Sequence, residues 1–67
     1  MNDTDRATME MMEQNVGRNC NFTLDDGTVM VGTVGGVSNA EHYRVGVPRN
    51  GYVWDWYVRS ECIQIQK

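Results

Sequence analysis

The chain has little of what marks several large classes of protein. Among its 67 residues there is one proline, one histidine and two cysteines. No apolar run approaches the roughly 18 residues that a membrane-spanning helix needs. The polar, acidic start MNDTDRATME also lacks the basic and apolar parts of a secretory signal. We therefore expect one domain, residues 1–67, located in the cytoplasm and not in a membrane.

The candidate metal ligands are scattered along the chain. Cys20, His42 and Cys62 form no CxxC or HxxxH pair, whereas a structural zinc site needs about four ligands at recognisable spacing. Since thiols stay reduced in the cytosol, we expect both cysteines to be free and mostly buried. We expect neither a metal nor a cofactor.

Catalytic constellations are equally scarce. General acid–base catalysis needs carboxylates or histidine in one cleft, and a cysteine nucleophile needs a nearby base. Asp25 and Asp26 resemble an acid pair, but they precede Gly27 in a predicted turn, where aspartate is favoured for backbone reasons. We expect that the protein is not an enzyme.

Acidic residues are concentrated in the first part of the chain. The net charge is −3, and residues 1–26 hold an excess of acids while residues 27–67 are slightly basic. Non-specific binding of nucleic acid requires a large basic surface that releases counterions. The composition therefore argues against that mode and leaves room only for a local site built on one or two arginines.

Residues 3–16 have the pattern of one amphipathic helix. Asp3 or Thr4 can cap it, Met9, Met12 and Val16 recur at spacings of three and four, and the next residue is glycine. So short a helix is marginal alone. We expect its methionine face to pack on one open end of the domain that follows.

From residue 18 onward apolar residues alternate with polar ones, which is typical of β-strands. Glycines at 32, 35 and 36 indicate sharp bends in the second strand. We expect strands at 20–24, 28–37, 43–47, 52–58 and 62–66, connected by turns or loops at 25–27, 38–41, 48–51 and 59–61. Five strands in about 48 residues can bury their inner faces only by curling. The predicted fold is therefore mainly β: a helix, then a strongly bent, five-stranded antiparallel barrel of the SH3-like or Sm-like kind over residues 18–66.

The apolar side chains exceed what so small a barrel can hold. The strand at 52–58 has large groups on both faces, with Trp54, Trp56 and Val58 on one of them. We expect both tryptophans in the core or in a subunit interface. Oligomerisation through the exposed edges of the fourth and second strands would cover the remainder.

Two segments resemble the motifs of the Sm-like family, which includes bacterial Hfq and the spliceosomal Sm proteins. FTLDDGTVMVGTVGGVSNAEHYRV, residues 22–45, follows the first motif, with its glycine turn and bent strand. YVRSECIQI, residues 57–65, follows the second, with its arginine-containing corner. Together they span most of the chain.

The resemblance implies a homo-oligomeric ring of five to seven subunits, joined by pairing of the fourth and fifth strands and holding RNA at the pore. Arg59 matches the family arginine that packs beside a bound base. Ser38 stands in place of the family's loop aspartate, His42 in place of its asparagine and Ala40 in place of its stacking aromatic residue; a tyrosine at position 43 or 52 can supply a ring. The candidate RNA-binding residues are Ser38, Asn39, His42, Arg59 and Ser60.

A function of a different class stays open. An SH3-like domain can act as a protein-interaction or assembly module without binding nucleic acid, using strand edges and aromatic surfaces to meet another protein. The acidic pI and the departures at Ala40 and His42 are compatible with that function.

Overall fold

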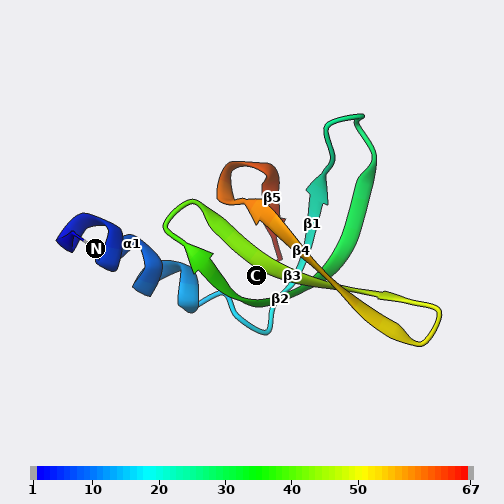
Figure 1. Ribbon diagram of the computed structural model, residues 1–67, viewed down its shortest axis with the longest axis horizontal. Coiled ribbons are helices and arrows are strands. Elements are labelled where there is room, and N and C mark those ends of the chain that lie inside the picture. Colours follow the sequence, from blue (N-terminus) through cyan, green and yellow to red (C-terminus); the bar gives the residue numbers. More distant parts are fainter. Residues whose placement is uncertain (1, 67) are drawn as a thin grey trace.

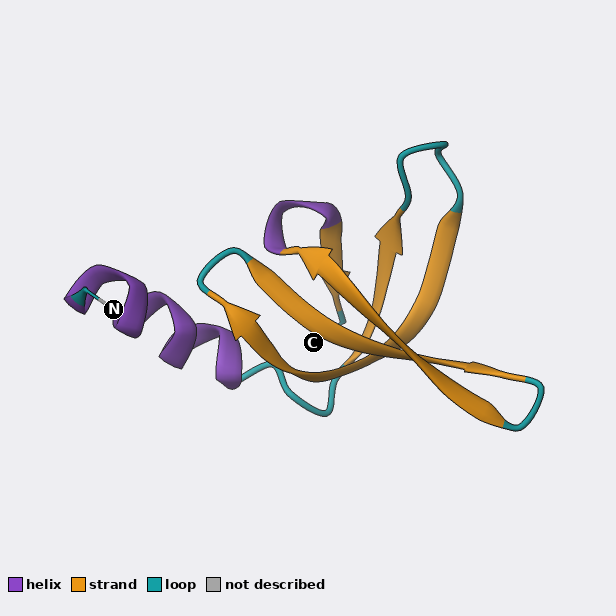
Figure 2. Cartoon of the chain, in the orientation of Figure 1, coloured by secondary structure: helices purple, strands orange, loops and turns teal. Residues whose placement is uncertain are grey.

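The computed structural model describes residues 2–66 and shows a helix followed by a bent antiparallel sheet (Figures 1 and 2). The elements are α1 (Asp3–Glu13), β1 (Asn19–Thr23), β2 (Val29–Asn39), β3 (His42–Arg49), β4 (Tyr52–Arg59), the 3-10 turn η1 (Ser60–Cys62) and β5 (Ile63–Ile65). The strand order is β4-β3-β2-β1-β5. The prediction of a mainly β fold with an N-terminal helix is confirmed.

Helix α1 is shorter than the predicted 3–16. The side chain of Asn2, and not Asp3 or Thr4, caps it by accepting a hydrogen bond of 2.7 Å from the Asp5 N–H. After Glu13 the backbone tightens into a turn that ends at Gly17, whose φ of +90° favours glycine. No helix in the described part of the chain is long and apolar enough to cross a membrane.

One end of the helix is attached to the sheet through β2 and β3. Met12 is buried in the core, and the Asn15 side-chain amide donates a hydrogen bond of 3.1 Å to the Tyr43 hydroxyl. The Gly17 N–H also donates to the Val34 carbonyl at 2.8 Å. The methionine face therefore packs on the sheet at Met12, while the start of the helix projects away from it (Figure 1).

Strand β2 is long and bent, as the glycines predict. A Cβ at Gly32 would lie 2.5 Å from the Gly46 carbonyl oxygen, so only glycine permits β2 and β3 to approach this closely. A register shift between Val34 and Gly36 marks a bulge at Gly35. The bend lets β2 pair with β1 through its first half and with β3 through its second half.

Both hairpin turns form where they were predicted. Gly27 and the pair Asn50 and Gly51 have positive φ angles, which such turns require. The second turn is tighter than predicted, because Pro48 and Arg49 belong to β3 and only Asn50 and Gly51 connect it to β4. The loop predicted at 38–41 is likewise reduced to two residues, since β2 extends to Asn39.

The predicted closure of the sheet into a barrel is wrong. Within residues 2–66, β4 pairs with β3 and β5 pairs with β1, while β4 and β5 form the two outer edges. Strand β5 has three residues instead of the predicted five because η1 takes up the preceding segment. The prediction that β2 is an edge strand is also wrong, because it lies in the middle of the sheet.

The core lies on the inner, concave face of the sheet. Its buried side chains are all apolar or weakly polar: Met12, Cys20, Phe22, Val34, Tyr43, Val45, Val47 and Val58. The ring of half-buried Trp56 packs on Phe22 with a centroid distance of 6.0 Å. Both cysteines are free, and burial raises the pKa of the Cys20 thiol, but Cys62 is exposed, contrary to the prediction.

The far end of the β3–β4 hairpin extends beyond the rest of the sheet (Figure 1). We call residues 48–54 the hairpin arm. Tyr52, Val53 and Trp54 on it are 74%, 70% and 57% exposed. Trp54 therefore lies outside the core of the chain, whereas Trp56, two residues closer to the centre of the sheet, packs on the core.

Candidate nucleic-acid interface

At the His42 end of the β3–β4 pair, the residues that face away from the core are polar, whereas the core residues between them are apolar. His42 pairs with Arg59 and Arg44 pairs with Tyr57 across the two strands. Directly paired residues project from the same face of a sheet. Because the intervening Val58 points into the core, these four side chains share the outer face.

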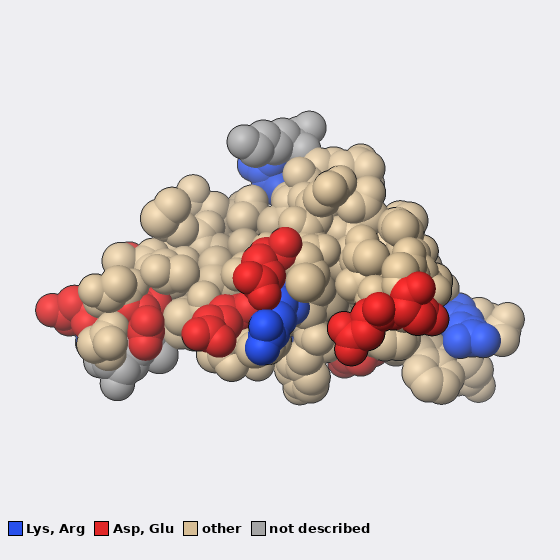
Figure 3. All heavy atoms as spheres, turned by 90° about the horizontal axis from the view of Figure 1, so that it is seen from above, with Lys and Arg blue, Asp and Glu red and all other residues tan. Residues whose placement is uncertain are grey.

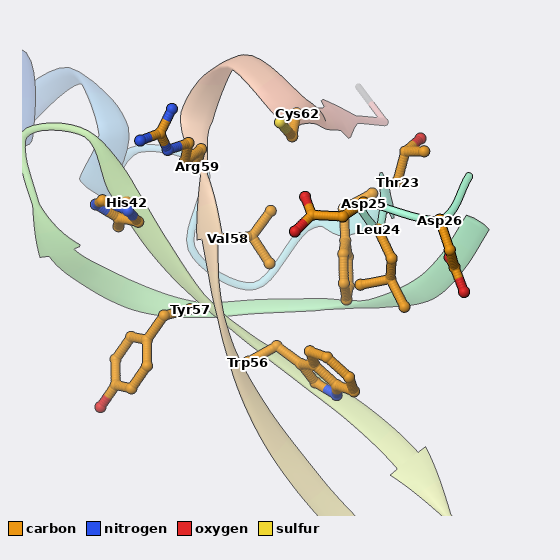
Figure 4. Close-up of a pocket in the computed structure, with 11 residues that line it drawn as sticks. Thr23, Leu24, Asp25, Asp26, His42, Trp56, Tyr57, Val58, Arg59 and Cys62 are labelled. Carbon is orange, nitrogen blue, oxygen red and sulfur yellow. The ribbon is translucent and has the colours of Figure 1, made fainter. Parts of the chain in front are cut away.

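The close-up in Figure 4 shows this division around β4. Trp56 and Val58 lie on the side of the strand where Leu24 is found. Tyr57 and His42 lie on the opposite side. We call the residues Asn39, His42, Arg44, Tyr57 and Arg59 the outer patch.

The turn between β2 and β3 orients His42. The Asn39 Oδ1 accepts a hydrogen bond of 2.8 Å from the Glu41 N–H and lies 3.0 Å from His42 Nδ1. Because Asn39 Oδ1 is an acceptor here, the imidazole Nδ1 must be the donor. A neutral His42 ring then has Nε2 as an acceptor for a donor group on a ligand.

Arg44 contacts two glycines of β2. Its Nη2 donates a hydrogen bond of 2.9 Å to the Gly35 carbonyl, and a Cβ at Gly36 would come within 2.9 Å of the same nitrogen. A guanidinium has five N–H donors in a planar fork. The bond to Gly35 therefore fixes Arg44 on the outer face and leaves donors for a ligand.

Arg59 is engaged only by a weak surface contact. Its Nη1 lies 3.2 Å from the Glu61 Oε1, and the two side chains are 65% and 71% exposed. Exposed ion pairs contribute about 0–1 kcal/mol, so an incoming phosphate can replace Glu61 at low cost. The Ser60 N–H donates to the Glu41 carbonyl at 2.8 Å, which attaches this corner to the β2–β3 turn.

The structure brings most of the predicted site residues together. Asn39, His42, Arg59 and Ser60 lie at one end of the β3–β4 pair. Ser38 lies one residue before Asn39 and lines a neighbouring hollow beside Arg44.

Two residues of the outer patch, Arg44 and Tyr57, were not among the predicted site residues. A signal for Tyr57 was its predicted place on the fourth strand, on the face opposite Trp56 and Val58, with Arg59 two residues further along the chain. Tyr57 also supplies the exposed ring that Ala40 lacks. Tyr43 is buried and Tyr52 lies on the hairpin arm, so neither supplies a ring at this place.

Charge on the surface is mixed. On the face in Figure 3, acidic and basic side chains are interspersed and the basic ones form no continuous area. With a net charge of −3, the protein has no large counterion-releasing surface to offer. Any binding of a polyanion would therefore need a local site rather than a broad basic surface.

The inner face has a cavity of about 610 Å³ beside the unpaired edge of β4. Phe22, Leu24, Trp56 and Val58 contribute its apolar lining, and His42, Tyr57 and Arg59 of the outer patch also border it. Asp26 lies at this cavity, and hydrogen bonds from the Thr28 side chain and N–H lower the pKa of its carboxyl. The cavity exists because the sheet does not close.

No model of a known protein family, no curated protein and no solved structure matches the chain. The resemblance to the Sm-like family therefore stays a prediction made from the residues. Among residues 2–66, no group of three or more His, Cys, Asp or Glu side chains is placed to hold a metal ion.

Proposed function

We propose that the protein binds single-stranded nucleic acid, in the first place RNA, through the outer patch. The observation that carries the proposal is the pair of adjacent cross-strand rows, His42 with Arg59 and Arg44 with Tyr57. Tyr57 is 70% exposed and presents a ring on which a base can stack. The two guanidinium groups beside it suit phosphate oxygens.

The expected strength of one such site is modest. Stacking of a base on Tyr57 contributes about 1–3 kcal/mol. Two arginine–phosphate contacts give a slope of about −1.4 for log K against log salt, at about −0.7 per contact for a single strand. One copy of the chain therefore binds weakly, and several copies on one strand gain avidity without any new contact.

The two free edges of the sheet supply a way to bring copies together. Strand β4 has an unpaired edge of eight residues, and β5 has an unpaired edge of three. Unpaired edges are templates for pairing with another chain. We propose a homo-oligomer in which β5 of one copy pairs with β4 of the next and covers the inner cavity, as the Sm-like resemblance implies.

Fluorescence anisotropy with short labelled RNA strands at low salt tests the nucleic-acid site. We expect Arg59→Ala and Arg44→Ala each to weaken binding about tenfold, since each removes a charge-assisted contact. Arg6→Ala is the matched control, because this exposed arginine lies on the helix and away from the patch. Failure of the folded protein to bind RNA, or equal loss in all three variants, would overturn the proposal.

A separate measurement tests the assembly. Native mass spectrometry across micromolar concentrations should show a closed set of five to seven copies. Single copies of the wild-type chain at every concentration would remove the oligomer.

The hairpin arm favours a second function, that of a protein-interaction module. Tyr52, Val53 and Trp54 are exposed apolar and aromatic residues at the start of β4. Aromatic residues are enriched in protein interfaces. A protein retained in a pull-down after nuclease treatment, and lost with Trp54→Ser but not with Tyr57→Ser, would support this function. Loss with Tyr57→Ser alone would favour the outer patch.

A further inference from the structure

A hollow of about 390 Å³ adjoins the outer patch and is large enough for one nucleobase. Four side chains that bear on ligand chemistry line it: Glu13 from the end of α1, Ser38 from β2, Arg44 from β3 and Tyr57 from β4. Gly35 and Gly36 also line the hollow, and neither has a side chain that would fill it. Elements far apart in the sequence thus place an acceptor, donors and a ring around one space.

We propose that this hollow binds a guanine base of the RNA and that Glu13 is the residue that selects it. The inference rests on the proposed function and deepens it, because it names the base that the outer patch prefers. Tyr57 supplies the stacking surface, and the Glu13 carboxylate accepts hydrogen bonds from the N1–H and the exocyclic amino group of guanine.

The selectivity follows from the chemistry of a carboxylate. An ionised carboxylate has two acceptor oxygens and no donor. Guanine is the one common RNA base whose Watson–Crick edge has two adjacent donors. Adenine and cytosine place a ring-nitrogen acceptor beside their amino group, and uracil places a carbonyl on each side of its N–H, so those bases direct an acceptor at the carboxylate. Hydrogen bonds to a charged group are about twice as strong as neutral ones, which magnifies the difference.

Arg44 complements the neighbouring edge of the same base. Guanine has two acceptors, O6 and N7, next to its N1–H, and a guanidinium is the usual partner for them. Arg44 donates one hydrogen bond to Gly35 and has further N–H groups on the hollow. The Glu13 carboxylate, which only accepts, therefore matches the donor edge of guanine, and the Arg44 guanidinium, which only donates, matches its acceptor edge.

Neither an ion pair nor the helix dipole accounts for a glutamate at position 13. Within residues 2–66 the single ion pair joins Arg59 and Glu61, so the Glu13 carboxylate has no cationic partner there. Glu13 is also the last residue of α1, and a negative charge at that end of a helix opposes the helix dipole. The backbone at Glu13 is nevertheless positioned beside the hollow, because the neighbouring Met12 is buried in the core and Asn15 is bonded to Tyr43.

Anisotropy measurements with heptameric RNAs that differ only in the central base test the inference. The probes are strands of uridine with guanosine, inosine, adenosine or uridine at the centre; inosine lacks the exocyclic amino group of guanosine. We expect the wild-type protein to bind the guanosine strand about tenfold more tightly than the others, the cost of one charge-assisted hydrogen bond. Glu13→Gln should abolish this preference without weakening binding to the all-uridine strand or lowering the unfolding temperature.

The control and the outcomes separate the two proposals. Glu10→Gln removes the same charge from an exposed position of the helix that does not line the hollow, and it should keep the preference for guanosine. Equal binding of the guanosine and inosine strands, or a preference that survives Glu13→Gln, would overturn the guanine assignment and leave RNA binding intact. A folded protein that binds none of the four strands would overturn both.

Discussion

The inner and outer faces of the sheet differ sharply although they alternate along the same strands. On β3, Tyr43 and Val45 are 5% and 0% exposed, while Arg44 between them lies on the outer face. On β4, buried Val58 is flanked by Tyr57 and Arg59, which are both exposed. The inner residues are constrained by packing, whereas the outer residues are free of that constraint and can serve binding. Substitutions of packed residues should therefore lower stability more than substitutions of exposed ones.

The largest expected difference is between two aromatic rings. Phe22→Ala removes a ring that is 2% exposed and should lower the free energy of unfolding by about 3–5 kcal/mol. Tyr57→Ala removes a ring that is 70% exposed and should change it by at most about 0.5 kcal/mol. Urea unfolding followed by circular dichroism measures both. Equal losses would show that the two faces are not distinct in packing.

For β3, alternation in the sequence was sufficient to predict which face is inner, but it did not show how far the sheet curls. The pattern at Tyr43, Val45 and Val47 is regular, and all three are buried as expected. The failure to close depends on η1, which shortens β5, and no periodicity in the sequence marks that turn. The end of α1 at Glu13 was missed because Val16 continues the helical spacing although it lies in the following turn.

A second comparison concerns two glycines of β2. Gly32→Ala places a Cβ 2.5 Å from the Gly46 carbonyl oxygen, so backbone must move, and we expect a loss of about 1–3 kcal/mol. Gly35→Ala meets its nearest atom, the Arg44 carbonyl oxygen, at an ordinary 3.5 Å and should be almost neutral. The midpoints of thermal unfolding should therefore separate clearly. A larger loss for Gly35→Ala would contradict the closeness of β2 and β3 at Gly32.

The two tryptophans give a smaller difference. Trp56→Ala removes the half-buried ring that packs on Phe22 and should cost about 2 kcal/mol or more. Trp54→Ala changes a ring that is 57% exposed and should cost less than half as much in the single copy. Chemical unfolding at low protein concentration measures both. If Trp54→Ala cost as much as Trp56→Ala, the hairpin arm would have to be packed rather than exposed.

The smallest effect is expected at Asp26, and it depends on pH. Hydrogen bonds from Thr28 lower the pKa of Asp26 in the folded state, so the carboxylate stabilises the fold above its unfolded pKa of about 4. This contribution is lost as the pH falls below about 4 and through the folded pKa. The unfolding temperature of Asp26→Asn should therefore fall slightly less than that of the wild type between pH 5 and pH 2. An identical fall in both proteins would show that Asp26 adds nothing.

The candidate site was predictable only in part. The Sm-like resemblance pointed to His42 and Arg59, and the register of β3 and β4 pairs them. The hollow that joins Glu13 to Arg44 was not predictable, because it depends on where α1 ends and how it attaches to β2 and β3. Local periodicity carries no information about contacts between segments that are about thirty residues apart in the sequence.

The most direct test of the outer patch is an NMR titration of the isotopically labelled protein with a short single-stranded RNA. We expect the amide shifts to concentrate at residues 35–44 and 57–60, with the amides of the hairpin arm and of residues 22–26, which line the inner cavity away from the outer patch, unchanged. Shifts confined to the arm, or to residues 22–26, would contradict the assignment of binding to the outer face.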